Sequence, residues 1–126
     1  MQPVDELREQ LLKAERILDT EFSFDLAEPA YLRCLDLIAD NPGDRPQFVR
    51  LLTSLFLEGR LSDEPVAFLM HKLRWIEIRE WAQAQLNAMI DPRIHGRPFV
   101  KIINGFSDHW ENRAFYKSFG GGALSG

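Results

Sequence analysis

Residues 46–59 read PQFVRLLTSLFLEG, and this stretch decides the fold class. Its apolar residues recur at helical spacing and cover most of the circumference of a helix; they are Phe48, Val49, Leu51, Leu52, Leu55, Phe56 and Leu57. A helix that is apolar on most of its surface has to be covered on several sides. We therefore expect it to lie centrally in a core that is made of other helices.

The residues that flank this helix mark its two ends. Asn41-Pro42-Gly43 separates it from the preceding segment, because proline disfavours helical geometry in the residue before it and glycine accepts a left-handed turn. Asp44 and Gln47 predict an N-terminal cap, and Gly59 predicts the end of the helix. The polar run 62–65 then predicts the start of the next helix.

Two more helices are predicted before residue 41. The first carries one apolar stripe at steps of three and four residues, formed by Val4, Leu7, Leu11, Ala14 and Leu18. The second is predicted from Asp25 to about Asp40, with Asp25 and Glu28 as a capping pair. Cys34 is expected in its buried face as a small apolar residue.

Residues 66–90 contain neither Gly nor Pro, so the sequence is compatible with one long helix and also with two shorter helices. The apolar positions change phase along this segment, since the stripe that includes Leu69 and Leu73 lies on a different side of the helix from the one that includes Ile78 and Ala82. We favour two helices that meet near residues 74–76. Trp75 and Trp81 would flank that corner.

Two short helices are predicted in the last third of the chain. One runs from about Pro98 to Phe106, and the other begins at a cap made by Asp108 and Glu111. The second would carry Trp110, Ala114, Phe115 and Phe119. Residues 120–126 have no core-forming content and are expected to form a flexible Gly-rich tail, which leaves residues 1–119 as a single α-helical domain.

The fold class that follows is all-α: a compact, irregular bundle of six or seven helices arranged as stacked antiparallel helical pairs. Alternating strand patterns with hairpin turns are lacking in the sequence. Glu28-Pro29 and Glu64-Pro65 stand 36 residues apart, and each opens a helix that is followed by another. In this the chain distantly resembles the helical hairpins of HEAT and tetratricopeptide arrays. Their signature positions do not recur here, so the resemblance implies no functional residues.

Composition points to an ordinary globular protein of 126 residues with a net charge of −4. Cys34 is the only cysteine, which indicates a reducing compartment, and the acidic start MQPVDELREQ does not resemble a signal peptide. No apolar run approaches the length of a membrane-spanning helix. We therefore expect a cytoplasmic protein without a membrane partner.

Catalytic and metal-binding signatures are lacking in the sequence. His71, His95 and His109 are scattered rather than spaced as zinc ligands, and the motifs HExxH, CxxC and GxSxG do not occur. Glu77 and Glu80 share a helix face, but Arg74 and Arg79 lie near enough to pair with them as surface ions. These observations favour a protein that is not an enzyme and that needs no metal or cofactor.

Charge is distributed unevenly along the chain. Residues 1–90 contain 10 Lys or Arg and 16 Asp or Glu, whereas residues 91–126 contain 5 and 3. Aromatic residues alternate with the cations of the last third, and such a mixture can grip a partner. The candidate partner-binding residues are Arg74, Trp75, Arg79, Trp81, Arg93, Arg97, Lys101, Trp110, Arg113 and Tyr116. Aromatic residues at helical spacing are also typical of a core.

The leading hypothesis is a non-catalytic protein–protein interaction module. Its acidic first three-quarters predict a basic macromolecular partner, as an adaptor or a toxin-neutralising antidote would have. One alternative is an enzyme with acid–base residues around His95, Asp108, His109 and Glu111. Another is RNA binding through the basic and aromatic last third, which the net negative charge disfavours. Self-association stays open.

Overall fold

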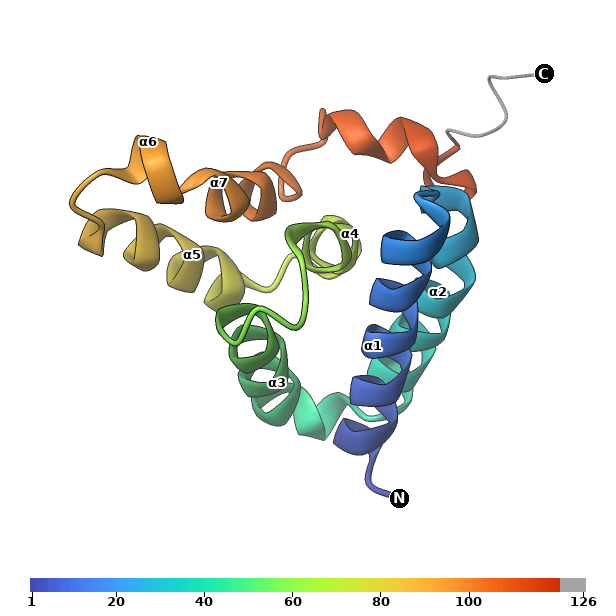
Figure 1. Ribbon diagram of the computed structural model, residues 1–126. Helices are drawn as coiled ribbons and strands as arrows, with labels where there is room; N and C mark the ends of the chain where they lie inside the picture. The colour runs from blue at the N-terminus through green and yellow to red at the C-terminus, as the bar shows by residue number, and fades with distance from the viewer. Residues whose placement is uncertain (121–126) are drawn as a thin grey trace. The chain divides into compact units, whose positions relative to one another are not determined.

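The computed structural model describes residues 1–120, and every regular element in that part of the chain is helical (Figure 1). The α-helices are α1 (Pro3–Glu21), α2 (Phe24–Asp40), α3 (Arg45–Leu57), α4 (Asp63–Leu73), α5 (Ile76–Ala88), α6 (Pro92–His95) and α7 (Arg97–Asn104). Three short 3-10 helices accompany them: η1 (Pro42–Asp44), η2 (Glu111–Phe115) and η3 (Lys117–Phe119). The all-α prediction is confirmed. The predicted tail lies outside the described residues from position 121 onward.

The chain divides into two compact units. Unit 1 consists of Met1–Leu61 together with the residues from Glu111 onward, and unit 2 consists of Ser62–Trp110. Each unit has buried apolar residues of its own. The single domain over residues 1–119 stays a prediction, and the two units are described separately below.

In unit 1, α1 and α2 lie side by side and antiparallel (Figure 1). The predicted stripe of α1 is buried at Leu7, Leu11 and Ala14. The helix ends at Glu21 and is capped by Phe22, which adopts the left-handed conformation with φ 52° while its N–H donates to the Leu18 carbonyl. This conformation is unfavourable for a residue with a side chain, but it lets the chain reverse before α2 begins at Phe24.

α3 buries one face, which packs against α1. That face consists of Phe48, Leu51, Leu52 and Leu55. The expectation that this helix is covered on several sides is wrong, because Leu57 is 58% exposed. At about 100° per residue Leu57 lies roughly opposite Phe48, so the buried face cannot include both.

The predicted capping pair of α2 is also wrong. α2 begins at Phe24 after Ser23, and the buried Glu28 carboxylate accepts hydrogen bonds from the opposite end of the chain. Its donors are the backbone N–H groups of Lys117, at 3.0 Å, and Ser118, at 2.8 Å, together with the Ser118 hydroxyl. Glu28 therefore fastens the carboxyl-terminal segment to α2.

That segment does not form the α-helix that Asp108 and Glu111 predict. It forms η2 and η3, with Phe115 stacked on Phe24 at 5.0 Å between ring centroids and with Tyr116 fully buried. The physical reason is that the Glu28 carboxylate accepts hydrogen bonds from N–H groups at the start of η3. In a continuous α-helix these groups would donate to carbonyl oxygens of the helix itself. A distant acceptor thus replaces the local cap.

Glu28→Ala is expected to detach this segment. The substitution leaves two partly buried N–H groups without an acceptor, which costs about 1–3 kcal/mol of local stability. Amide hydrogen exchange followed by NMR should accelerate about tenfold or more at Lys117 and Ser118. Asp36→Ala, an exposed position on the same helix, is the control and should leave both amides protected. Equal exchange in the two variants would contradict the role of Glu28.

In unit 2 the predicted pair of helices is confirmed. α4 ends at Leu73 and α5 begins at Ile76, with Arg74 in the left-handed conformation at φ 55° between them. α7 packs against both helices, and Trp81 of α5 meets Phe99 of α7 edge-on at 5.5 Å. Pairing of consecutive helices therefore describes α1 and α2, whereas α7 is the shared neighbour of α4 and α5.

Gly105, which follows α7, permits a close backbone contact with α4. A Cβ at this position would lie 2.7 Å from the Ala67 carbonyl oxygen and 3.0 Å from the Ala67 Cα. Both atoms belong to the backbone of α4, so a side-chain rotation cannot relieve the clash. The Gly105 carbonyl also receives the Nδ1–H of the buried His71, at 2.8 Å.

Gly105→Ala is therefore expected to destabilise unit 2. Overpacking of this kind costs about 1–3 kcal/mol because the backbones of α4 and α7 have to separate. Gly43→Ala is the matched control, since a Cβ at Gly43 has no neighbour within 4 Å. Urea unfolding curves of both variants and the wild type provide the comparison. A Gly105→Ala variant as stable as Gly43→Ala would refute the close contact.

Candidate interaction surfaces

The structure uses Arg74, a predicted partner-binding residue, to build the corner of unit 2. Its guanidinium donates hydrogen bonds to the His71 and Phe106 carbonyl oxygens and forms an ion pair with Asp108 at 3.0 Å. A left-handed backbone and three acceptors fix this side chain in place. The predicted pairing of Arg74 with the Glu77 and Glu80 carboxylates gives way to Asp108.

Arg79 joins Arg74 at a depression on unit 2. The two arginines line it together with the carboxyl end of α7 and the turn that follows, and its volume is about 430 Å³. The other lining residues are Ile103, Asn104, Phe106 and Ser107. Two of the predicted partner-binding residues therefore line one depression, although the Arg74 guanidinium is already occupied by protein acceptors.

Three of the four aromatic residues that were predicted to bind a partner are buried in the protein. Trp75 and Trp110 are each 5% exposed and Tyr116 is fully buried, while Trp81 is half-buried against Phe99. Trp110 packs against the His71 ring at 5.1 Å, and Tyr116 contacts the ring of Tyr31 at 6.1 Å. Side chains buried this far offer a partner almost no surface, so we do not retain a partner-binding or base-stacking role for these three residues.

The predicted basic residues are exposed, but they belong to different units. Arg93, Arg97 and Lys101 are exposed on α6 and α7 of unit 2, whereas Arg113 is exposed on η2 of unit 1. Arg93 forms an ion pair with Asp91 at 3.2 Å. Burial raises the pKa of the Asp63 carboxyl, and the nearby Lys101 and Arg97 act in the opposite direction.

The residues of the enzyme hypothesis are all exposed. Asp108 is held by Arg74, the His109 N–H donates to the Ser107 hydroxyl oxygen, and His95 ends the short helix α6. Glu111 belongs to unit 1. Over residues 1–120 no three His, Cys, Asp or Glu side chains are grouped so that they could hold a metal ion.

The acidic surplus of the chain lies on the α1–α2 hairpin. Residues 3–40 contain 10 Asp or Glu and 4 Lys or Arg, a net charge of −6. Residues 41–90 contain 6 of each kind, so the rest of the acidic region is neutral. The exposed carboxylates of the hairpin are Glu6, Glu9, Asp19, Glu21, Asp25, Asp36 and Asp40. Counting charge helix by helix would have found this concentration in the sequence.

Exposed apolar side chains lie at the turn of the same hairpin. Phe22 is 87% exposed and Leu26 is 53% exposed, and Asp19, Glu21 and Asp25 stand beside them in the sequence. Phe22 is held outside by a left-handed backbone, an arrangement that costs energy in the isolated protein. The sequence analysis did not predict that Phe22 is exposed, because an aromatic residue between two helices is typical of a core.

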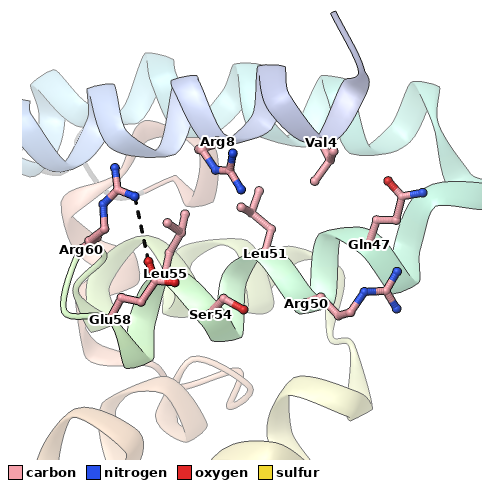
Figure 2. Close-up of a pocket in the computed structure, with 9 residues that line it drawn as sticks. All are labelled: Val4, Arg8, Gln47, Arg50, Leu51, Ser54, Leu55, Glu58 and Arg60. Atoms are coloured by element: carbon pink, nitrogen blue, oxygen red, sulfur yellow. Dashed lines mark ion pairs between the residues drawn. The ribbon is translucent and has the colours of Figure 1, made fainter.

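A groove on unit 1 lies between α1 and α3 (Figure 2). Its volume is about 370 Å³, and its apolar lining residues are Val4, Leu51 and Leu55, of which Leu51 and Leu55 are buried. The polar lining residues are Arg8, Gln47, Arg50, Ser54, Glu58 and Arg60. Arg8 and Arg50 stand 42 positions apart in the sequence, so charge counting along the chain could not bring them together.

The fold also bears on membranes. None of the helices in residues 1–120 combines the length and the apolar composition that crossing a bilayer requires.

Comparison of the chain with known proteins found no matching family model, no similar curated protein and no similar solved structure.

Proposed function

We propose that this protein is a non-catalytic protein–protein interaction module that binds a basic partner protein through its α1–α2 hairpin. The observation that carries the proposal is the net charge of −6 on that hairpin, on a chain whose net charge is −4. A negative surface attracts a cationic partner over distances of about 10 Å at moderate salt and accelerates association.

Phe22 and Leu26 give this surface the apolar anchor that charge alone does not supply. Binding energy at protein interfaces is concentrated in a few apolar or aromatic side chains, and surrounding charges contribute to association rate and to specificity. An exposed Phe22 flanked by carboxylates matches that division of roles. Adaptors and antidotes that neutralise a basic toxin are both proteins of this class.

Affinity capture from the cells that produce the protein tests the proposal, with three baits. The first is the wild type, and the second carries Asp19→Asn, Glu21→Gln and Asp25→Asn at the turn. The third carries Glu58→Gln, Glu80→Gln and Glu111→Gln, which remove the same number of exposed charges elsewhere. We expect a stoichiometric basic protein on the wild type and on the third bait, and its loss from the second.

The captured protein is then purified and its association rate is measured at about 0.01 M and about 1 M salt, where the screening lengths are roughly 30 Å and 3 Å. We expect the rate to fall by about tenfold or more. Phe22→Ala should accelerate dissociation without changing this salt dependence. Recovery of the same partner on all three baits, recovery of an acidic partner, or no stoichiometric partner would overturn the proposal.

A further inference from the structure

The groove between α1 and α3 carries positive charge on a unit that is otherwise acidic. Its lining contains three arginines and one glutamate, a net charge of +2, whereas the α1–α2 hairpin that borders it has a net charge of −6. Arginine recognises carboxylate oxygens through two parallel N–H donors. The lining therefore favours an anionic ligand, which the outer face of the hairpin would repel.

The arginines are spread along the groove rather than gathered at one point. Figure 2 shows Arg50 and Gln47 at one end, Arg60 and Glu58 at the other, and Arg8 reaching from α1 toward Leu51 between them. Arg50 and Glu58 are eight residues apart on the same helix and its end, which corresponds to a length of about 12 Å. Cations thus stand at both ends of an elongated site.

The guanidinium groups are available to a ligand. Among residues 1–120 Arg50 takes part in no ion pair. Arg8 faces Asp5 at 3.9 Å and Arg60 faces Glu58 at 3.9 Å, and all four side chains are about half exposed. Exposed pairs at this separation contribute little, so a ligand carboxylate can displace them at small cost.

We propose that this groove binds a linear dicarboxylate, with one carboxylate at Arg50 and the other at Arg60. Arg8 then stands over the middle of the ligand and can reach either carboxylate. A volume of about 370 Å³ falls in the range of small-molecule sites. The α1 residues of the groove, Val4 and Arg8, lie at the opposite end of that helix from Phe22, the apolar anchor of the proposed protein-binding surface.

Titration of the full-length chain with suberate, followed by proton–nitrogen correlation NMR, tests this inference. Octanoate, the monocarboxylate of the same chain length, reports what the second carboxylate contributes, and sulfate reports binding of an oxyanion alone. We expect saturable shifts at Val4, Arg50, Leu51 and Ser54, and an affinity for suberate about fivefold or more above that for octanoate and for sulfate.

Two variants complete the test, because their spectra also show whether each chain is folded. Arg50→Gln should reduce suberate affinity to the level of octanoate while octanoate affinity changes little, and Arg16→Gln, an exposed arginine of α1 outside the groove, should change neither. Equal affinities for suberate and octanoate in the wild type, shifts confined to other parts of the chain, or an absence of saturable shifts would each overturn the inference.

Discussion

Leu52→Ala is expected to lower the free energy of unfolding by about 2–5 kcal/mol, a large part of the stability of a chain of this size. Leu52 is 1% exposed, on the face of α3 that packs against α1. Removing its isobutyl group loses burial of apolar surface and leaves a cavity that a helix pair held by neighbouring leucines can close only in part.

Leu57→Ala on the same helix provides the matched control. The same atoms are removed, but Leu57 is 58% exposed and its side chain lies on the outer face, so the change should stay within about 0.5 kcal/mol. Denaturant unfolding of both variants, read by tryptophan fluorescence and by circular dichroism, measures the difference. Comparable losses in the two variants would mean that α3 does not bury the face described above.

The Cys34 thiol should be almost inert in the native protein. It is fully buried on α2, and this burial raises its pKa from 9.0 to about 12, although the neighbouring Arg33 acts in the opposite direction. The thiolate is the reactive species, so at pH 8 its fraction is about a thousandfold smaller than in the unfolded chain. Reaction with a disulfide reagent should be slower by at least that factor.

The control for this experiment is the double substitution Cys34→Ala with Leu32→Cys, which places a thiol at a position that is 40% exposed on the same helix. That thiol should react about as fast as one in the unfolded chain. Because the folded pKa of Cys34 is raised, its contribution to stability is complete below pH 9 and is lost as pH rises toward 12. Rapid native labelling of Cys34 would contradict its burial.

The parts of the fold that the sequence predicted correctly are those that depend on neighbouring residues. The stripe from Leu7 to Ala14 places α1, and the change of apolar phase after Leu73 places the corner between α4 and α5. Helical periodicity is local, so a single sequence contains it. The candidate surfaces were harder to predict from the sequence, because exposure of Trp110 or Tyr116 depends on which distant side chains cover them.

The two capping predictions were wrong for the same reason, because they used only the spacing of residues along the chain. Asp25 with Glu28, and Asp108 with Glu111, have the spacing of reciprocal caps, yet Glu28 bonds to residues 89 and 90 positions away and Asp108 bonds to Arg74. A carboxylate satisfies whichever donors the folded chain brings to it, and a donor in a buried position gains more from that bond than an exposed one. Spacing alone cannot tell which donors these will be.

By itself the sequence determined that this protein is all helical, where most helices begin and end, and that its negative charge belongs to its first part. Only the tertiary structure decided that Phe22 stays outside, that Glu28 holds the carboxyl-terminal segment, and that Arg8 and Arg50 share a groove. The physical reason is that helix formation follows from interactions three and four residues apart, whereas burial, pairing and grooves follow from contacts between segments that the chain connects only at a distance.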